Sequence, residues 1–408
     1  MILNEIEHRY TLWARYLFIA LPAFIVISPT ATTALEVFLY LLFIITPELR
    51  KRFIMSLRQP MVISGLFFCF VIVISSLWSD ASWENKLEHI RSWRKILLLP
   101  IGVAIIHNRE LKKQFLLIFV LAIGFYALIS WACYLFDIQL PFDSQPPKEA
   151  ASLLRNHATQ GIIFSVAAFT TASLYFYHQD IKPTTKYLLI FIFLVTLSNC
   201  IIVSTSRSGY IIGIMFTLCF FLYLGKKKAL LLAPLALITF LGALYLSPTP
   251  HEKIKSVVDE AINFEQLKTL TSSGARIIFW TNTIKIIKKA PIFGYGLKSM
   301  KLEYTKQVKG QHGWQGTITG DPHNQYFLIL VEQGAAGLLV FLIFIFSCFR
   351  QKTEKLYKYI GVSLLCGWLT TSLFNGHFSA SVEGKLIFLW CGAMLSMPLS
   401  KKKIPERL

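Results

Sequence analysis

The chain has 408 residues, 54% of them hydrophobic, and a mean hydropathy of +0.55. This composition excludes an ordinary soluble protein and indicates a polytopic membrane protein. The net charge of +19 would suggest a nucleic-acid partner only if the basic residues formed one patch, and they do not. The seven cysteines lie inside or at the edges of apolar segments, so they indicate neither a disulfide framework nor a cysteine-based metal site.

Apolar segments recur along the whole chain. Each fits a membrane-spanning helix of roughly 17–25 residues once its flanks are counted. The twelve segments lie at about 13–28, 31–46, 61–78, 95–106, 114–136, 157–177, 187–204, 209–224, 229–247, 324–349, 358–374 and 386–398. They predict an all-α membrane protein with about twelve transmembrane helices.

The basic residues are concentrated on one side of these spans. With the N-terminus inside, the densest Lys and Arg clusters all fall on the same side, at 50–52, 112–113, 226–228 and 401–403. By the positive-inside rule, this asymmetry predicts that both termini are cytoplasmic. The basic charge therefore indicates orientation rather than a nucleic-acid partner.

The chain divides into three parts. We expect residues 1–247 to form a membrane domain with spans 1–9, residues 248–323 to form a periplasmic loop subdomain, and residues 324–408 to form spans 10–12. Within the loop, apolar residues at helical spacing predict one amphipathic helix over 251–268. A second amphipathic helix follows Gly274, and its basic face is typical of a helix lying at a membrane surface.

Proline and glycine mark the end of that second helix. It ends at Ala290 because Pro291 cannot continue it. A turn follows in which Gly294, Tyr295 and Gly296 are expected to bring backbone amides near a bound anion. We therefore interpret these three residues as substrate-binding candidates.

Arg207 lies in a polar break between the seventh and eighth apolar segments. A charge at membrane depth is costly and indicates function by default. The planar guanidinium suits a diphosphate because it binds phosphate oxygens in a bidentate manner and stays charged. The alternative is an arginine that extends its side chain to the lipid headgroups.

Arg276 opens the second loop helix. A helix N-terminus favours anions, so an arginine there is electrostatically misplaced unless it serves a bound anion. An ordinary contact with lipid headgroups is the alternative.

His323 and Asn324 end the hydrophilic loop, and the chain then re-enters an apolar segment with two glycines. If a helix begins at His323, Gly334 and Gly337 share one face of it and allow another helix to approach closely. An imidazole can act as a base near neutral pH because its unperturbed pKa is about 6.5. Asn324 would orient the ring or bind a sugar. For the histidine, the alternative is a helix cap or a structural hydrogen bond.

A metal site is an alternative in this region. His312, Asp321 and His323 are possible ligands, but their spacing lacks a recognised zinc pattern. We expect no metal and no other cofactor.

These features together resemble the O-antigen ligase family, which is related to O-antigen polymerases. The resemblance rests on about twelve spans, one large outward loop before the last three, and a His-Asn pair followed nine residues later by Gly-x-x-Gly. In this chain the motif is His323-Asn324, then 325–333, then Gly334-Ala335-Ala336-Gly337.

The resemblance in organisation covers nearly the whole chain. At the residue level it is confined to about 204–211, 274–296 and 321–340. The family's first essential arginine is often followed four residues later by leucine, whereas this chain has Ile211, which weakens the distinction between ligase and polymerase.

The resemblance implies a glycosyltransferase of GT-C type in the bacterial inner membrane. Its donor would be a glycan on undecaprenyl diphosphate and its acceptor the outer core of lipid A–core, with the active site facing the periplasm. The family's essential residues fall on Arg207, Arg276 and His323. The arginines would neutralise the leaving diphosphate, and the histidine would accept the proton from the attacking sugar hydroxyl. Direct displacement would invert the anomeric carbon.

Two other functions are compatible with parts of the sequence. An O-antigen polymerase would use the same donor with another lipid-linked chain as acceptor. A transporter or flippase for lipid-linked glycans would also suit twelve spans, but related halves are not visible in the sequence. Acidic residues within the spans are nearly absent, Glu36 being the main one, and this argues against proton or sodium coupling.

Overall fold

The structure is a computed structural model that describes residues 2–138, 156–179, 181–262 and 271–399. All regular secondary structure in these ranges is helical. The first ten labelled helices are α1 (Ile2–Ile27), α2 (Pro29–Ile45), α3 (Pro47–Ser56), α4 (Pro60–Ile74), α5 (Trp83–Trp93), α6 (Leu98–Ile105), α7 (Arg109–Phe136), α9 (His157–Tyr177), α10 (Pro183–Ser198) and α11 (Arg207–Tyr223).

The remaining helices complete the bundle and the outer region. They are α12 (Lys226–Leu246), α13 (Pro248–Ile262), α14 (Ser272–Lys289), α15 (Met300–Gln307), α16 (Gln325–Glu332), α17 (Gly334–Phe349), α18 (Lys355–Thr371) and α19 (Ser381–Met394). The 3-10 turn η2 (Arg94–Leu97) leads from α5 towards α6.

Several helices are suited to a membrane. Within the described ranges, six are long and apolar enough to cross one, or seven if α2 and α3, which are bent by 99° to each other, form a single span. Two shorter apolar helices, α11 and α17, accompany them. The chain is therefore a multi-pass membrane protein, as predicted. The count of twelve spans is not confirmed by this criterion and stays a prediction.

Helix α19 occupies the centre of the bundle. Its residues 382–394 are all buried, as expected for a helix surrounded by others. The Trp390 ring packs against Phe115 and Phe119 of α7, with ring centroids 5.5 and 5.2 Å away. The backbones of α6 and α19 approach closely at Gly102, where a Cβ would lie 2.8 Å from the carbonyl carbon of Gly392. This packing fixes the C-terminal part of α19.

A second close approach fixes the start of α11. A Cβ on Gly209 would lie 2.8 Å from the backbone of Gly161 in α9, and one on Gly161 would lie 2.2 Å from the Ser206 Cβ. Only residues without a side chain allow the two helices to meet this closely. The position of Arg207, the first residue of α11, follows from this contact.

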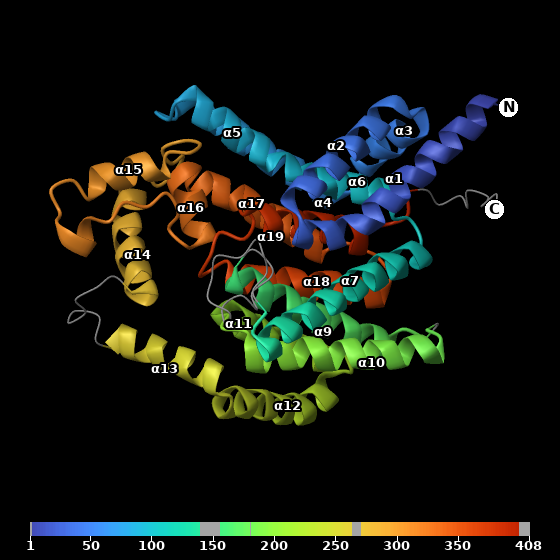
Figure 1. Cartoon of the computed structure of the whole chain (residues 1–408). Helices are drawn as coiled ribbons and strands as arrows, with labels where there is room; N and C mark the ends of the chain where they lie inside the picture. The colour runs from blue at the N-terminus through green and yellow to red at the C-terminus, as the bar shows by residue number, and fades with distance from the viewer. Residues whose placement is uncertain (1, 139–155, 180, 263–270, 400–408) are drawn as a thin grey trace.

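The loop helices lie together at one end of the molecule. Figure 1 shows α13, α14 and α15 at its left side, whereas α1 begins at the right. A small separate core joins α14, α15 and α16; it consists of Phe279, Ile286, Met300, Tyr304, Val308, Leu328 and Val331. The helix predicted after Gly274 is confirmed: α14 is capped by Thr271 and ends at Lys289 before Pro291. The helix predicted over 251–268 is α13 as far as Ile262, and 263–270 lie outside the described residues.

Glu36, the main acidic residue predicted within a span, is fully buried and ion-paired. Its Oε1 lies 2.8 Å from Lys385 Nζ of α19, and its Oε2 lies 3.7 Å from Arg94 Nη2. A buried charge left without its partner is strongly destabilising. This pair therefore ties α2 to the N-terminal end of α19.

We expect Glu36→Leu to lower stability by about 3–5 kcal/mol because it leaves the Lys385 ammonium buried without its carboxylate. The double variant Glu36→Leu/Lys385→Met should regain most of that loss. Thermal unfolding of the purified protein in detergent would measure both. Purely additive effects of the two substitutions would contradict the pairing.

Candidate functional site

His323 lies in the turn before α16, and Asp321 holds it. Its φ of 52° is in the left-handed region that non-glycine residues rarely adopt. Its backbone N–H donates to Asp321 Oδ1 at 2.8 Å, and its Nδ1 lies 3.7 Å from Oδ2. The ring stacks on Phe279 of α14 at 6.1 Å between centroids, and the side chain is 40% exposed. A carboxylate-oriented, accessible imidazole is suited to general base chemistry.

Asn324 caps α16. Its Oδ1 accepts from the N–H groups of Tyr326 and Phe327, both at 3.0 Å, and its Nδ2 donates to Leu373 O at 3.0 Å. The helix therefore starts at Gln325, and the condition of a helix that begins at His323 is not met. With both ends of its amide engaged in the fold, the buried Asn324 acts as a helix cap, and its expected role in orienting the ring or binding a sugar stays a prediction.

The apolar segment after His323 is broken at Gly334. α16 ends at Glu332 and α17 begins at Gly334, whose φ is 67°. A Cβ on Gly334 would lie 2.2 Å from Ile292 O, so this glycine contacts the backbone of the preceding turn. One on Gly337 would lie 2.2 Å from the Gln333 Cβ. The prediction that both glycines face a neighbouring helix from one continuous helix is therefore wrong.

The backbone N–H groups of the turn at Gly294-Tyr295-Gly296 form hydrogen bonds that stabilise the break between α16 and α17. The N–H groups of Tyr295 and Gly296 donate to the carbonyls of Val331 and Glu332, both at 2.8 Å, and Gly294 N–H donates to Ala290 O at 3.2 Å. These amides are therefore not directed at an anion, contrary to the prediction. The turn instead positions α16 and, through it, the residues before α16.

Arg207 points from the start of α11 towards the loop helices. Its Nη1 donates to Ser273 Oγ at 2.9 Å, and its Nη2 lies 3.8 Å from Glu260 Oε1 of α13. Its side chain is 21% exposed, and its Nε is buried with no hydrogen-bond partner among the described residues. Burial alone would raise the pKa of Glu260, but hydrogen bonds from Ser273 and the charge of Arg207 lower it overall. Arg207 is thus held between α11, α13 and α14.

Arg276 lies on α14, about one turn after Ser273, the residue that Arg207 contacts. Burial lowers the pKa of its guanidinium, the charge of Arg207 lowers it further, and the carboxylates of Asp321 and Glu260 oppose that change. Arg276 is therefore within the electrostatic range of both Arg207 and the aspartate that holds His323. The structure brings the three residues predicted to be catalytic to the same end of the molecule.

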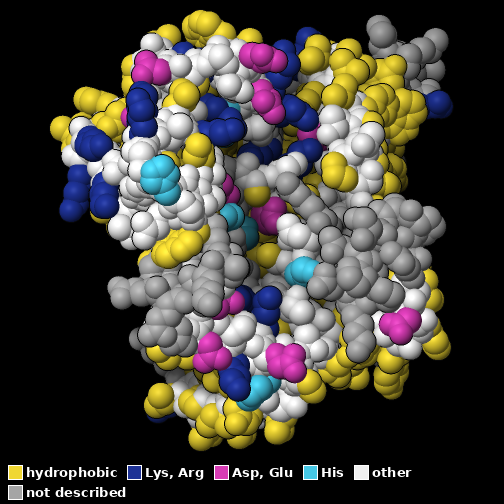
Figure 2. Space-filling view, turned by 60° about the vertical axis from the view of Figure 1, so that its left-hand side comes forward, with side chains coloured by type: hydrophobic (Ala, Val, Ile, Leu, Met, Phe, Trp, Pro, Cys, Tyr) yellow, Lys and Arg dark blue, Asp and Glu magenta, His cyan; other side chains and the backbone are white. Residues whose placement is uncertain are grey.

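A cavity of about 640 Å³ lies beside His323. Segments from five parts of the chain line it, within 88–92, 156–158, 298–301, 320–332 and 375–383. Figure 2 shows a hollow at this end of the molecule, with acidic, basic and histidine side chains around it. Neither predicted arginine lines the cavity, but Asn375 of its wall donates to Ser208 Oγ at 3.0 Å, directly beside Arg207.

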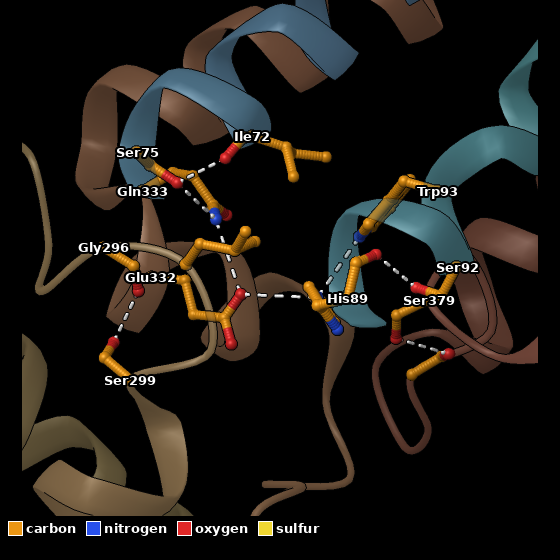
Figure 3. A network of polar contacts seen from close by, with 12 residues as sticks. Ile72, Ser75, His89, Ser92, Trp93, Gly296, Ser299, Glu332, Gln333 and Ser379 are labelled. Carbon is orange, nitrogen blue, oxygen red and sulfur yellow. Dashed lines mark hydrogen bonds and ion pairs between the residues drawn. The ribbon is translucent and has the colours of Figure 1, made fainter. Parts of the chain in front are cut away.

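One wall of the cavity carries a buried polar network (Figure 3). Glu332 Oε2 lies 3.8 Å from His89 Nε2 and 3.4 Å from Gln333 Nε2. Trp93 Nε1 donates to His89 Nε2 at 3.2 Å. Burial, assisted by the charges of Lys298 and Lys95, lowers the pKa of His89 to about 3, so this ring is neutral at physiological pH.

Several residues that line the cavity or contact Arg207 were not among the predicted site residues. Glu332 lies inside the His-Asn…Gly-x-x-Gly spacing, and an acidic residue in an apolar segment was a signal available from sequence. His377 and Glu383 lie in a short outward loop and at the start of the last span, where no pattern distinguished them. His89 and Glu260 lie on amphipathic helices, where ordinary solvent-facing residues look the same.

Metal ligation is not evident in the described part of the chain. No group of three or more His, Cys, Asp or Glu side chains there could hold a metal ion. The expectation of a metal-independent reaction remains a prediction.

Comparison with known proteins gives two matches. A Haemophilus influenzae (strain ATCC 51907 / DSM 11121 / KW20 / Rd) protein, described as an uncharacterized protein, is 26% identical over 310 residues, which is 74% of each chain. Residues 192–342 match the family model described as O-antigen ligase. This segment, which is similar to the O-antigen ligase family, contains Arg207, Arg276 and His323.

Proposed function

We propose that this protein is a glycosyltransferase of GT-C type that moves a glycan from undecaprenyl diphosphate to the outer core of lipid A–core. The reaction would take place at the periplasmic face of the bacterial inner membrane, with both termini of the enzyme in the cytoplasm. One observation carries the proposal: Arg207 and Arg276 lie within each other's electrostatic range, and Asp321 links Arg276 to His323.

The chemistry follows from the charges. A hydroxyl oxygen of the acceptor sugar forms a bond to the anomeric carbon as the bond from that carbon to the diphosphate oxygen breaks. The diphosphate leaves with the electron pair, and two guanidinium groups stabilise its growing negative charge. His323 takes the hydroxyl proton, and Asp321 stabilises the imidazolium that forms. A single displacement of this kind inverts the anomeric carbon.

We expect Arg207→Ala, Arg276→Ala and His323→Ala each to reduce glycan transfer by at least about 100-fold, because each removes a group that acts in the transition state. The arginine variants should also lose affinity for the lipid-linked donor, whereas His323→Ala should bind it normally. Transfer assays and donor-binding assays with purified components would separate these effects.

Lys285→Ala is the matched control, since it removes an exposed positive charge from the same helix as Arg276. It should retain transfer. Near-normal transfer by any of the three alanine variants would remove that residue from the mechanism.

Transfer should persist after a chelator removes divalent ions, because the arginines supply the positive charge at the diphosphate. The assay uses purified lipid-linked glycan and lipid A–core, and the anomeric configuration of the product should be inverted. Chelator-sensitive turnover would contradict metal independence. A product consisting of lengthened lipid-linked chains, rather than glycan on lipid A–core, would identify a polymerase.

A further inference from the structure

Two cavity residues outside the proposed catalytic group carry polar atoms that no described residue satisfies. His377 is 4% exposed and Glu383 is 5% exposed, and both line the cavity beside His323. Neither His377 Nε2 nor Glu383 Oε2 has a hydrogen-bond partner in the described part of the protein. Leaving a buried polar atom without a hydrogen-bond partner is unfavourable, so we expect a ligand to bond to these two atoms.

The other atoms of Glu383 are firmly held. Its Oε1 accepts a hydrogen bond from Thr159 Oγ1 at 2.5 Å, and its backbone carbonyl accepts one from Trp368 Nε1 at 3.1 Å. The free oxygen is therefore presented from a fixed position at the start of the central helix α19. A group fixed in this way needs no rearrangement to bind a ligand.

The loop that carries His377 is also pinned. Buried Lys95 donates from Nζ to the carbonyls of Ser379 and Ala380 at 2.5 and 2.9 Å. From α16, Gln325 Oε1 accepts from the N–H of Ser379 at 2.9 Å. These contacts link the loop to the same helix that positions His323. The cavity and the proposed base thus have a fixed relation to each other.

The two arginines lie outside the cavity beside His323. Asp321, which holds His323, is within the electrostatic range of Arg276 and also of His377. His323 lines the cavity, whereas neither arginine does. If the arginines hold the diphosphate of the donor, the cavity is left for the molecule whose hydroxyl loses its proton to His323.

The polar groups of the cavity suit a sugar. Burial lowers the pKa of His377, against the opposing charges of Glu383 and Asp321, so its ring is neutral and offers one donor and one acceptor. A carboxylate accepts hydrogen bonds from hydroxyl groups. The volume of about 640 Å³ is within the range of small-molecule sites, roughly 300–1,000 Å³.

We propose that this cavity is the binding site for the acceptor sugar and that His377 and Glu383 bind its hydroxyl groups. The inference rests on the proposed transferase function and adds the location of the acceptor. Glycan donors should make no use of these two residues.

The test compares Glu383→Gln and His377→Ala with the unmodified protein in the transfer assay. Glu383→Gln keeps the size of the side chain and the bond from Thr159. In both variants we expect the KM for lipid A–core to rise about tenfold or more, the effect of losing a hydrogen bond to a charged or buried group. The KM for the lipid-linked donor should not change. An unchanged acceptor KM, or a rise in the donor KM instead, would overturn the proposal.

His178→Asn is the matched control, because His178 is a buried histidine that contacts Tyr357 in another part of the bundle. It should leave the acceptor KM unchanged. A similar rise in this control would show that loss of any buried histidine produces the effect, and would overturn the proposal.

Hydrogen exchange on the unmodified protein gives a test that does not depend on whether the variants fold. Hydrogen exchange of residues 375–385 should slow when lipid A–core is added alone and should not slow when the lipid-linked donor is added alone. Absence of protection by the acceptor would overturn the proposal. Protection by the acceptor without any glycan transfer would support the binding site and contradict the transferase function, so the two failures are distinguishable.

Discussion

The break between α16 and α17 sets the positions on which the candidate site depends. Carbonyls at Val331 and Glu332 accept from the turn at 294–296, and the N–H groups of Ala335 and Ala336 donate back to Pro291 and Ile292 at 2.8 and 3.0 Å. A side chain at Gly334 would push the two backbones apart. Because α16 is short and capped, any shift at this break would move His323, which lies two residues before the helix.

Electrostatics then explains why the outer helices gather around α11. Arg207 and Arg276 repel each other, and burial makes that repulsion stronger. Glu260 and Asp321 offset part of it from two sides. A diphosphate would offset more, since it carries several negative charges within the reach of both guanidinium groups. The outer region is thus held by charge as well as by the small core between α14, α15 and α16.

Local signals in the sequence predicted much of this arrangement. The proline at 291 predicted the end of α14 because it acts on adjacent backbone groups, whereas the predicted start after Gly274 came two residues later than the observed start at Ser272. The three candidate catalytic residues were predicted from different signals: Arg207 from a charge at membrane depth, Arg276 from a cation at a helix N-terminus, and His323 from an imidazole where the loop ends. By contrast, an asparagine at position 324 looks the same in the sequence whether it caps a helix or binds a sugar. Only its hydrogen bonds in the structure distinguish the two roles.

Contacts between distant segments could not be predicted in this way. A glycine pair spaced for helix packing looks the same as glycines that make room for a turn, so Gly334 was misinterpreted. The same limit applies to four side chains whose neighbours come from helices distant in the sequence: His89, Glu260, His377 and Glu383. The same holds for the number of spans, because hydropathy does not show where a helix such as α16 is cut short.

His323 illustrates a conflict between conformation and chemistry. Its φ of 52° is a conformation that glycine adopts freely and that a side chain makes unfavourable by roughly 1–3 kcal/mol. Glycine at this position would thus relieve local strain, yet the chain carries an imidazole here. Selection for stability alone would drive this position towards glycine, so a variant library screened only for thermostability should enrich a protein without the proposed base.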